Sequence, residues 1–259
     1  NSGTYVSWNW KAGTTGSGTT GGSGTYKTYN YSVNTTAGFS IVKYLGNGTA
    51  GHTIPHHLGA VPKMIMVKRI DSQNNWTVYH AVQGNTHGSY LDTTAAQVDS
   101  DAFWNDTTPT SSVFTLGNGA SVNNSSGTYI AYCFAEKTGY SKCGKFTGNQ
   151  NADGTFVYTG FKPQFIFFKQ YTSIVNWYIY DAKRDGINQG DGASGGNRSL
   201  RPNESHTEAT ASGYPIDILS NGWKFRTAST EVNKDGNHFF YLAIGQSLVG
   251  SNNVPCTAR

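Results

Sequence analysis

An internal repeat is the feature of this sequence that most restricts its fold, because both copies must adopt the same structure. GAVPKMIMVKRIDSQNNWTVYHA, residues 59–81, aligns with GFKPQFIFFKQYTSIVNWYIYDA, residues 160–182. The pairs that match at one constant spacing are Pro62 with Pro163, Trp76 with Trp177, and Tyr79 with Tyr180. Further along, residues 121–136 align with residues 231–246. The alignment predicts that Trp76 and Trp177 superimpose and are both largely buried.

The runs that the two copies share have the composition of β-strands. Runs such as KMIMVKR, NWTVYHA and GTYIAYCFAE are short, rich in β-branched and aromatic residues, and bounded by Gly, Asn, Asp and Pro. We therefore expect an all-β chain with two tandem antiparallel β-sandwich-like repeats, residues 38–139 and residues 140–247. A C-terminal tail, residues 248–259, would follow them.

The first residues resemble the end of a repeat. GTYVSWNWKAG, residues 3–13, aligns with GTYIAYCFAEK, residues 127–137, so residues 1–13 are expected to be the closing strand of an upstream β-domain. Trp8 and Trp10 would share one face of that strand and pack on the upstream domain or on another subunit, not on residues 38–247. The Gly-, Ser- and Thr-rich residues 14–37 are expected to form a flexible linker.

Composition excludes several classes of function. The chain has 19 Lys and Arg against 15 Asp and Glu, a formal net charge of only +4, and its basic residues are scattered, which argues against nucleic-acid binding. Its apolar runs are far shorter than the roughly 20 residues of a spanning helix, so no membrane insertion is expected. Cys133, Cys143 and Cys256 lack the spacing of a metal site, and we expect no disulfide between Cys133 and Cys143.

The sequence indicates no enzyme, and no catalytic residue, cofactor or metal ligand can be assigned. It contains no nucleophile elbow and no phosphate-binding loop. Residues 149–154, NQNADG, imitate the start of a calcium loop, but the position of the final Glu is Gly160, so a tight turn is expected. His52, His56 and His57 are expected at the surface of a loop or strand. A pair of carboxylates for glycoside cleavage stays open, because such pairs meet only in the fold.

Aromatic residues in turn-rich connections are the remaining candidates for binding. Trp104 and Tyr214 lie beside Asn, Asp and Pro in the divergent connection of each repeat, and Tyr90 and Asp106 lie near Trp104 in the sequence. Exposed rings in such settings are typical of carbohydrate or protein contacts. The alternative is that these rings close the end of the sandwich.

Several motifs in fixed order resemble those of a known group of proteins. YVSWNWKAG, SVNTTAGFSIVKYLGNGTAG, LGAVPKMIMVKR, NWTVYH, WNDTTPTSSVFTLG and GTYIAYCFAE are similar to the C-terminal repeat region of large bacteriophage virion proteins, over essentially the whole chain. In those proteins the region often follows a concanavalin-like or laminin-G-like jelly-roll domain.

The resemblance implies a structural protein on the surface of a virion. It would be a tail-fibre or appendage module that attaches to a glycan or protein of the host surface, contacts other virion subunits and forms a homo-oligomer, most plausibly a trimer. Two alternatives stay open. One is a purely structural capsid-surface decoration or extracellular filament subunit, and the other is a glycan-degrading enzyme.

Overall fold

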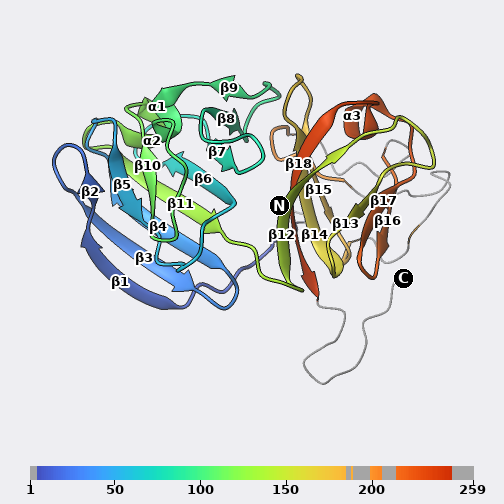
Figure 1. Cartoon of the computed structure of the whole chain (residues 1–259), viewed down its shortest axis with the longest axis horizontal. Coiled ribbons are helices and arrows are strands. Elements are labelled where there is room, and N and C mark those ends of the chain that lie inside the picture. The colour runs from blue at the N-terminus through green and yellow to red at the C-terminus, as the bar shows by residue number, and fades with distance from the viewer. Residues whose placement is uncertain (1–4, 185–187, 189–198, 206–213, 247–259) are drawn as a thin grey trace.

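The computed structural model of the chain describes residues 5–184, 188, 199–205 and 214–246. It shows two lobes side by side, both built almost entirely of antiparallel strands (Figure 1). The all-β class predicted from the sequence is confirmed. The predicted tail, residues 248–259, lies outside the described residues, as does Cys256. Among the described residues, no helix is long and apolar enough to cross a membrane.

The first lobe is a sandwich of two sheets. One has eight strands in the order β1-β3-β4-β11-β6-β7-β8-β9, and the other has three in the order β10-β5-β2. The strands are β1 (Thr14–Thr19), β2 (Gly21–Gly22), β3 (Thr28–Asn34), β4 (Phe39–Leu45), β5 (His52–Pro55), β6 (Met64–Arg69), β7 (Thr77–His80), β8 (His87–Tyr90), β9 (Val98–Asp99), β10 (Val113–Leu116) and β11 (Thr128–Phe134). Two single-turn helices, α1 (Asp101–Trp104) and α2 (Ala120–Asn123), complete the lobe.

The second lobe is a smaller sandwich. Its sheets have the orders β12-β18-β14-β15 and β13-β17-β16. The elements are β12 (Ser141–Thr147), β13 (Phe156–Tyr158), β14 (Lys162–Gln170), β15 (Trp177–Asp181), β16 (Ile216–Leu219), β17 (Gly222–Phe225), α3 (Thr230–Asn233) and β18 (His238–Gln246). The chain passes between the lobes from β11 to β12, where the sequence placed the boundary between residues 139 and 140.

The strand orders show that the two lobes repeat one fold. The run β4-β11-β6-β7 of the first lobe corresponds to β12-β18-β14-β15 of the second, and the pair β5-β10 corresponds to β13-β17. The correspondence extends to single contacts. The Trp76 backbone N–H donates to Asp92 Oδ1 (3.1 Å), and the Trp177 backbone N–H donates to Asn203 Oδ1 (2.9 Å). We call the lobes repeat 1 and repeat 2.

A buried asparagine organises the same loop in each repeat. Asn123 ends α2 and is fully buried, and its Nδ2 donates to the carbonyls of Gly117 (2.8 Å) and Thr49 (2.9 Å) while its Oδ1 accepts the Asn47 N–H (3.0 Å). In repeat 2 the side chain of Asn233 makes the corresponding hydrogen bonds. It contacts the carbonyls of Thr227 (2.8 Å) and Asn151 (3.1 Å) and the N–H of Asn149 (3.0 Å).

The predicted linker over residues 14–37 is wrong, because β1, β2 and β3 lie there and extend the sheet of repeat 1 beyond β4. The glycines of β1 make this pairing possible. Gly16 pairs with Tyr31 and Gly18 pairs with Tyr29, and a Cβ on either glycine would lie within 2.7 Å of the tyrosine hydroxyl oxygen. The tyrosine rings therefore cover the glycines across the strands, a pairing that stabilises strands of this composition.

Each sandwich has its own core, and a third cluster lies between the lobes. In β11 the side chains of Tyr129, Ala131 and Cys133 face the core of repeat 1, whereas Phe134 faces the cluster between the lobes. In β18 both faces are apolar, as in the run FFYLAI. Burial of both faces explains this run, because the outer face of β18 packs against repeat 1 instead of meeting water.

Candidate functional site

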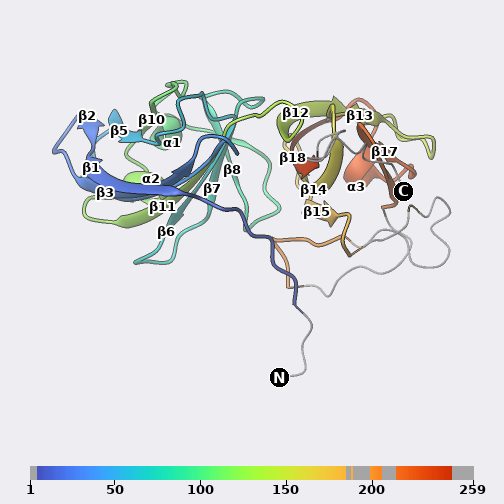
Figure 2. The ribbon, with the colours of Figure 1, turned by 90° about the horizontal axis from the view of Figure 1, so that it is seen from below.

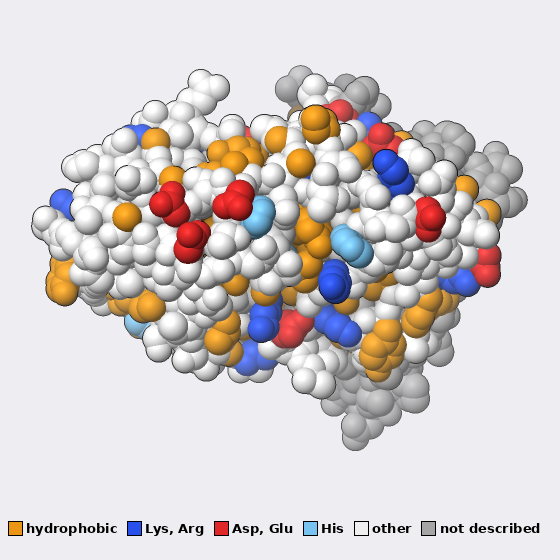
Figure 3. Space-filling model, turned by 45° about the horizontal axis from the view of Figure 1, so that its top comes forward, with side chains coloured by type: hydrophobic (Ala, Val, Ile, Leu, Met, Phe, Trp, Pro, Cys, Tyr) orange, Lys and Arg blue, Asp and Glu red, His pale blue; other side chains and the backbone are white. Residues whose placement is uncertain are grey.

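The interface between the repeats is the most elaborate contact in the described part of the chain. A segment of repeat 1, residues 90–97, packs on the outer face of repeat 2, and we call it the inserted segment. Trp177 Nε1–H donates to the Tyr90 carbonyl (2.9 Å), and the Thr94 carbonyl accepts the Val175 N–H (3.1 Å). We call the outer face of repeat 2 the receiving face, and its side chains are Phe167, Lys169, Tyr171, Trp177 and Phe240. Figure 3 shows hydrophobic side chains along the line where the lobes meet.

A lysine lies fully buried in this interface. Lys169 Nζ donates to the carbonyls of Val175 (2.7 Å) and Thr94 (3.3 Å) and lies 5.6 Å from the ring centroid of Trp177. Burial lowers the pKa of Lys169 to about 8. The ammonium group therefore joins the two repeats through backbone carbonyls and an aromatic face.

His80 makes a second polar contact across the interface. Its ring stacks on Phe240 with 4.5 Å between centroids, Nε2 contacts the Tyr241 carbonyl (3.1 Å), and Nδ1 accepts the Val82 N–H (3.2 Å). A carbonyl must accept and an N–H must donate, so these partners require the neutral ring with its proton on Nε2. His56 has the same arrangement, between the Thr110 carbonyl and the Leu58 N–H.

These two histidines should make stability depend on pH. Burial lowers the pKa of His56 and of His80 to about 4, below the ordinary value near 6.5, so the unfolded chain binds more protons between these values. The free energy of unfolding should have its full value above pH 6.5 and should decrease as the pH drops toward 4. The slope should approach about 1.4 kcal/mol per pH unit for each histidine near pH 5.

Urea unfolding between pH 5 and pH 7 checks this expectation. His80→Asn and His56→Asn should each lower the slope of the unfolding free energy against pH by an amount equivalent to about one bound proton. The double variant should lower it by about two. An unchanged slope in the double variant would show that these rings do not carry the pH dependence.

The N-terminal residues lie against this same interface, so the expectation that Trp8 and Trp10 avoid residues 38–247 is wrong. Figure 2 shows the described residues before β1 running up to the junction of the two lobes. The Trp10 ring lies 5.4 Å from Phe165 of repeat 2 and 6.0 Å from Phe134 of repeat 1, and the Trp8 ring lies 5.5 Å from Phe165. Residues 5–13 form no strand. Trp8 and Trp10 share one side, as predicted: both are half-buried and Asn9 between them is exposed, because the edge of the interface supplies the apolar surface that these rings cover.

Trp76 corrects a second expectation. It corresponds to Trp177, but Trp177 is fully buried and Trp76 is only half-buried. Trp76 belongs to the outer face of repeat 1, where its ring stacks on Tyr132 with 6.2 Å between centroids. We call this surface the Trp76 face, and its side chains are Met66, Lys68, Ile70, Trp76 and Tyr132. Three of its side chains, Met66, Trp76 and Tyr132, line an open apolar cavity of about 420 Å³, together with Trp8 and Trp10 of the N-terminal residues and Leu91 of the inserted segment.

The predicted binding residues do not form one site. Trp104 is buried, only 1% exposed, and packs edge-on against Tyr79 (5.6 Å), so the expectation of an exposed binding ring is wrong. α1 explains this: its N-cap Ser100 accepts the Ala102 N–H, and the single turn then directs Trp104 into the core. Asp106 lies exposed just after α1, and its carbonyl accepts a hydrogen bond from Asn85 Nδ2. The alternative stated from the sequence, that the ring closes the end of the sandwich, therefore describes Trp104 better than an exposed binding site does.

The two predicted tyrosines serve the packing of different lobes. Tyr90 is half-buried against Phe103 (5.8 Å), and its carbonyl is the acceptor for Trp177 described above. Tyr214 is half-buried in repeat 2, edge-on to Tyr178 (5.2 Å) and under the Arg201 guanidinium (5.7 Å). Only Tyr90 therefore contributes to the interface, and it does so through its backbone.

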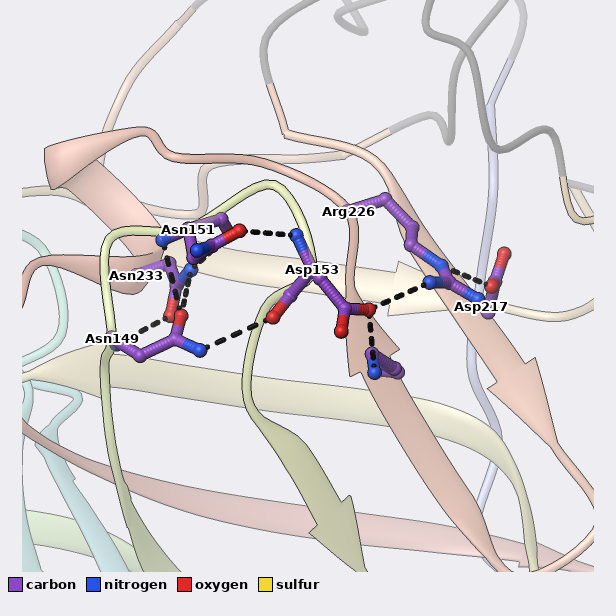
Figure 4. Close-up of polar contacts among 7 residues, drawn as sticks. Asn149, Asn151, Asp153, Asp217, Arg226 and Asn233 are labelled. Atoms are coloured by element: carbon purple, nitrogen blue, oxygen red, sulfur yellow. Dashed lines mark hydrogen bonds and ion pairs between the residues drawn. The ribbon is translucent and has the colours of Figure 1, made fainter.

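The calcium-like stretch is held by protein groups (Figure 4). Asn149 and Asn151 bind the loop internally and through Asn233, and the Asp153 N–H donates to Asn151 Oδ1 (2.8 Å). The Asp153 carboxylate faces away from them, toward Lys224 Nζ (2.7 Å) and Arg226 (3.3 Å). Arg226 in turn binds Asp217 Oδ2 (2.5 Å). The loop is a turn, as predicted. The carboxylate of Asp153 is paired with two cations, one in β17 and one on the residue that follows β17.

The histidines of HTIPHH are more buried than expected. His52 is fully buried between Asn123 Oδ1 (3.0 Å) and Thr20 Oγ1 (2.7 Å), which joins the loop of repeat 1 to the residue between β1 and β2. His57 has a left-handed backbone (φ 60°) and stacks on Tyr31 at 3.7 Å. Cys133 in β11 and Cys143 in β12 are both free thiols. Within the described residues, no three His, Cys, Asp or Glu side chains gather as a possible metal site.

Sequence reasoning missed Lys169 of the interface and its counterpart in repeat 1, Lys68. Lys68 and Lys169 occupy the same register of the repeat, in MIMVKR and FIFFKQ. The available signal was the contrast between these runs, because the outer-facing residues of repeat 2 are larger and more aromatic than those of repeat 1. A face enriched in this way indicates burial against a neighbour.

The fold and the interface define a protein of two tandem β-sandwich repeats, joined by the outer face of the second. Residues 1–247, which include both repeats and the N-terminal segment, match the model of one family, described as a domain of unknown function (DUF7483). The chain belongs to this family. Searches of curated proteins and of solved structures found no match.

Proposed function

We propose that the chain is a structural module of an extracellular particle, a bacteriophage virion, and that it works by binding other protein surfaces through its repeats. The single observation that carries this proposal is the Trp76 face. It corresponds to the receiving face, by which repeat 2 binds repeat 1, and yet it is open. An exposed apolar surface of this kind marks a site of interaction.

Three further observations support an assembly role. The resemblance to virion proteins supports a location at a particle surface, and the low content of charged residues fits a particle component. The rings expected to contact a glycan are used in packing, Trp104 fully and Tyr214 in part. Of the two roles that the resemblance implies, a structural role is therefore better supported than attachment to a host glycan.

Mass spectrometry of purified particles tests this function. Virions of the phage that encodes the chain are purified on a density gradient, and the tryptic peptide of residues 28–43 is quantified against the major structural proteins. We expect the peptide in the particle fraction, in amounts comparable with theirs. An antibody to the folded chain should label the particle surface in electron micrographs. Absence of the chain from the particles contradicts the proposal.

A glycan array separates the two roles. The intact chain and Trp76→Ala should both fail to bind any glycan specifically. Specific binding that Trp76→Ala abolishes would assign the Trp76 face to host attachment instead of assembly.

A further inference from the structure

The interface within the chain has two sides, and both recur elsewhere in it. On one side the receiving face offers two donors, Trp177 Nε1–H and Lys169 Nζ. On the other side the inserted segment offers two acceptors, the carbonyls of Tyr90 and Thr94. Both donors are fully buried where the inserted segment contacts them.

The receiving face recurs in repeat 1 as the Trp76 face. Lys68 Nζ donates to the Asn74 carbonyl, as Lys169 donates to that of Val175, and it lies 5.9 Å from the ring centroid of Trp76. The difference lies in coverage. Lys68 and Trp76 are half-buried, whereas their counterparts in repeat 2 are fully buried.

The apolar part of the two faces shows the same contrast. Ile70 is 50% exposed, whereas Tyr171 at the corresponding position is 9% exposed. Met66 and Tyr132 are also half-buried, and the counterpart of Met66, Phe167, is 4% exposed. Among the described residues, the Trp76 face is thus less covered than the receiving face, and Leu91 of the inserted segment lies only at the edge of its cavity.

The inserted segment recurs in repeat 2 as residues 200–205. Leu200 pairs with Ile179 next to β15, as Ser89 pairs with Val78 next to β7. Asn203 binds the Trp177 backbone N–H as Asp92 binds that of Trp76. By this register, the carbonyls of Arg201 and Ser205 stand where those of Tyr90 and Thr94 stand in repeat 1. Pro202 and Ser205 are exposed.

We propose that the Trp76 face binds a second copy of this chain head to tail, with residues 200–205 of the second copy placed as residues 90–97 are placed on repeat 2. Trp76 Nε1–H and Lys68 Nζ would then donate to the carbonyls of Arg201 and Ser205. The inference deepens the proposed function and rests on it, since it names the protein that covers the face. The new interface continues the interface already present within the chain.

Such an interface is heterologous, because different surfaces of the two copies meet. Repeated head-to-tail contacts build a closed ring if the rotation between copies closes, and an open filament if it does not. A ring of three copies would be the trimer that the resemblance implies.

Two variants of the intact chain test the geometry. Trp76→Ala removes the receiving ring, and Ser205→Arg places a cation beside the segment that should approach Lys68. Sedimentation over a range of concentrations should show wild-type oligomers, multiples of 28.0 kDa. Each variant alone should associate at least about tenfold more weakly. Tyr158→Ala, which truncates an exposed ring (58%) on repeat 2, is the matched control and should associate like the wild type.

Mixing the two variants distinguishes a heterologous contact from any other. Trp76→Ala keeps an intact segment and Ser205→Arg keeps an intact face, so the mixture should form a heterodimer of one copy of each and nothing larger. Cooperative thermal unfolding of each variant shows that it is folded.

Two results overturn the inference. They are a wild-type chain that stays monomeric up to its solubility limit, and a mixture that does not associate. Neither bears on the presence of the chain in virions, so the proposed function is judged separately by the particle analysis. If the chain is absent from virions but the two variants still form the heterodimer, the proposed function is rejected and the proposed contact between copies stands.

Discussion

Trp177→Ala should destabilise the protein by about 3–5 kcal/mol, the range for removing a fully buried aromatic side chain. The Trp177 ring stacks on Phe167 at 5.0 Å, meets Phe240 edge-on at 5.4 Å, and donates a hydrogen bond to the Tyr90 carbonyl. Its loss leaves a cavity, an unpaired carbonyl and a buried Lys169 without its aromatic partner. Urea unfolding followed by fluorescence and by circular dichroism measures the loss.

The repeat itself supplies the control. Trp76→Ala changes the same residue at the corresponding position, but the ring is half-buried and makes one aromatic stack, so the free energy of unfolding should fall by about 1 kcal/mol or less. Equal losses from the two variants would mean that the Trp76 face is as well covered as the receiving face. That result would contradict the asymmetry between the repeats.

The buried asparagines should be nearly as sensitive. Asn123→Ala and Asn233→Ala each remove one side chain that binds several backbone groups of a buried loop. An unsatisfied buried polar group costs about 1–3 kcal/mol, so each variant should lose about 3 kcal/mol or more. Denaturant unfolding provides the measurement.

Asn124→Ala is the matched control for Asn123. It removes the same kind of amide from the next residue, which is half-buried, and should change stability by about 0.5 kcal/mol or less. A loss from Asn123→Ala as small as that of the control would show that water or the relaxed loop satisfies the freed groups. The two asparagines would then be incidental to the fold.

Much of the local structure could be read from the sequence. The aligned repeats predicted two copies of one β-fold, and the order β4-β11-β6-β7 does recur as β12-β18-β14-β15. Period-2 patterns report which side chains share a face, and this information lies within each strand. The prediction failed over residues 14–37, where β1 has no apolar pattern of its own and where the alternating Tyr29, Tyr31 and Val33 of its partner β3 were not recognised as a strand.

The candidate site could be predicted only in part. The repeat identified Trp76 and Trp177 as equivalent, but the same local pattern gives one half-buried ring and one fully buried ring. Trp104 shows the same limit, because a polar, turn-rich context suggested exposure and a single helical turn directs the ring into the core. Burial depends on the neighbours that the chain brings to a side chain from far away in the sequence.

By itself, the sequence determined the all-β class and the tandem repeat, since these follow from short-range periodicity and from similarity between segments. Only the tertiary structure decided that the outer face of repeat 2 is covered by residues 90–97, that Trp8 and Trp10 line the same interface, and that the Trp76 face stays open. The physical reason is that the sequence of a strand specifies which side chains lie on each of its two faces. Whether the outer face is then buried depends on which other sheet or segment packs against it.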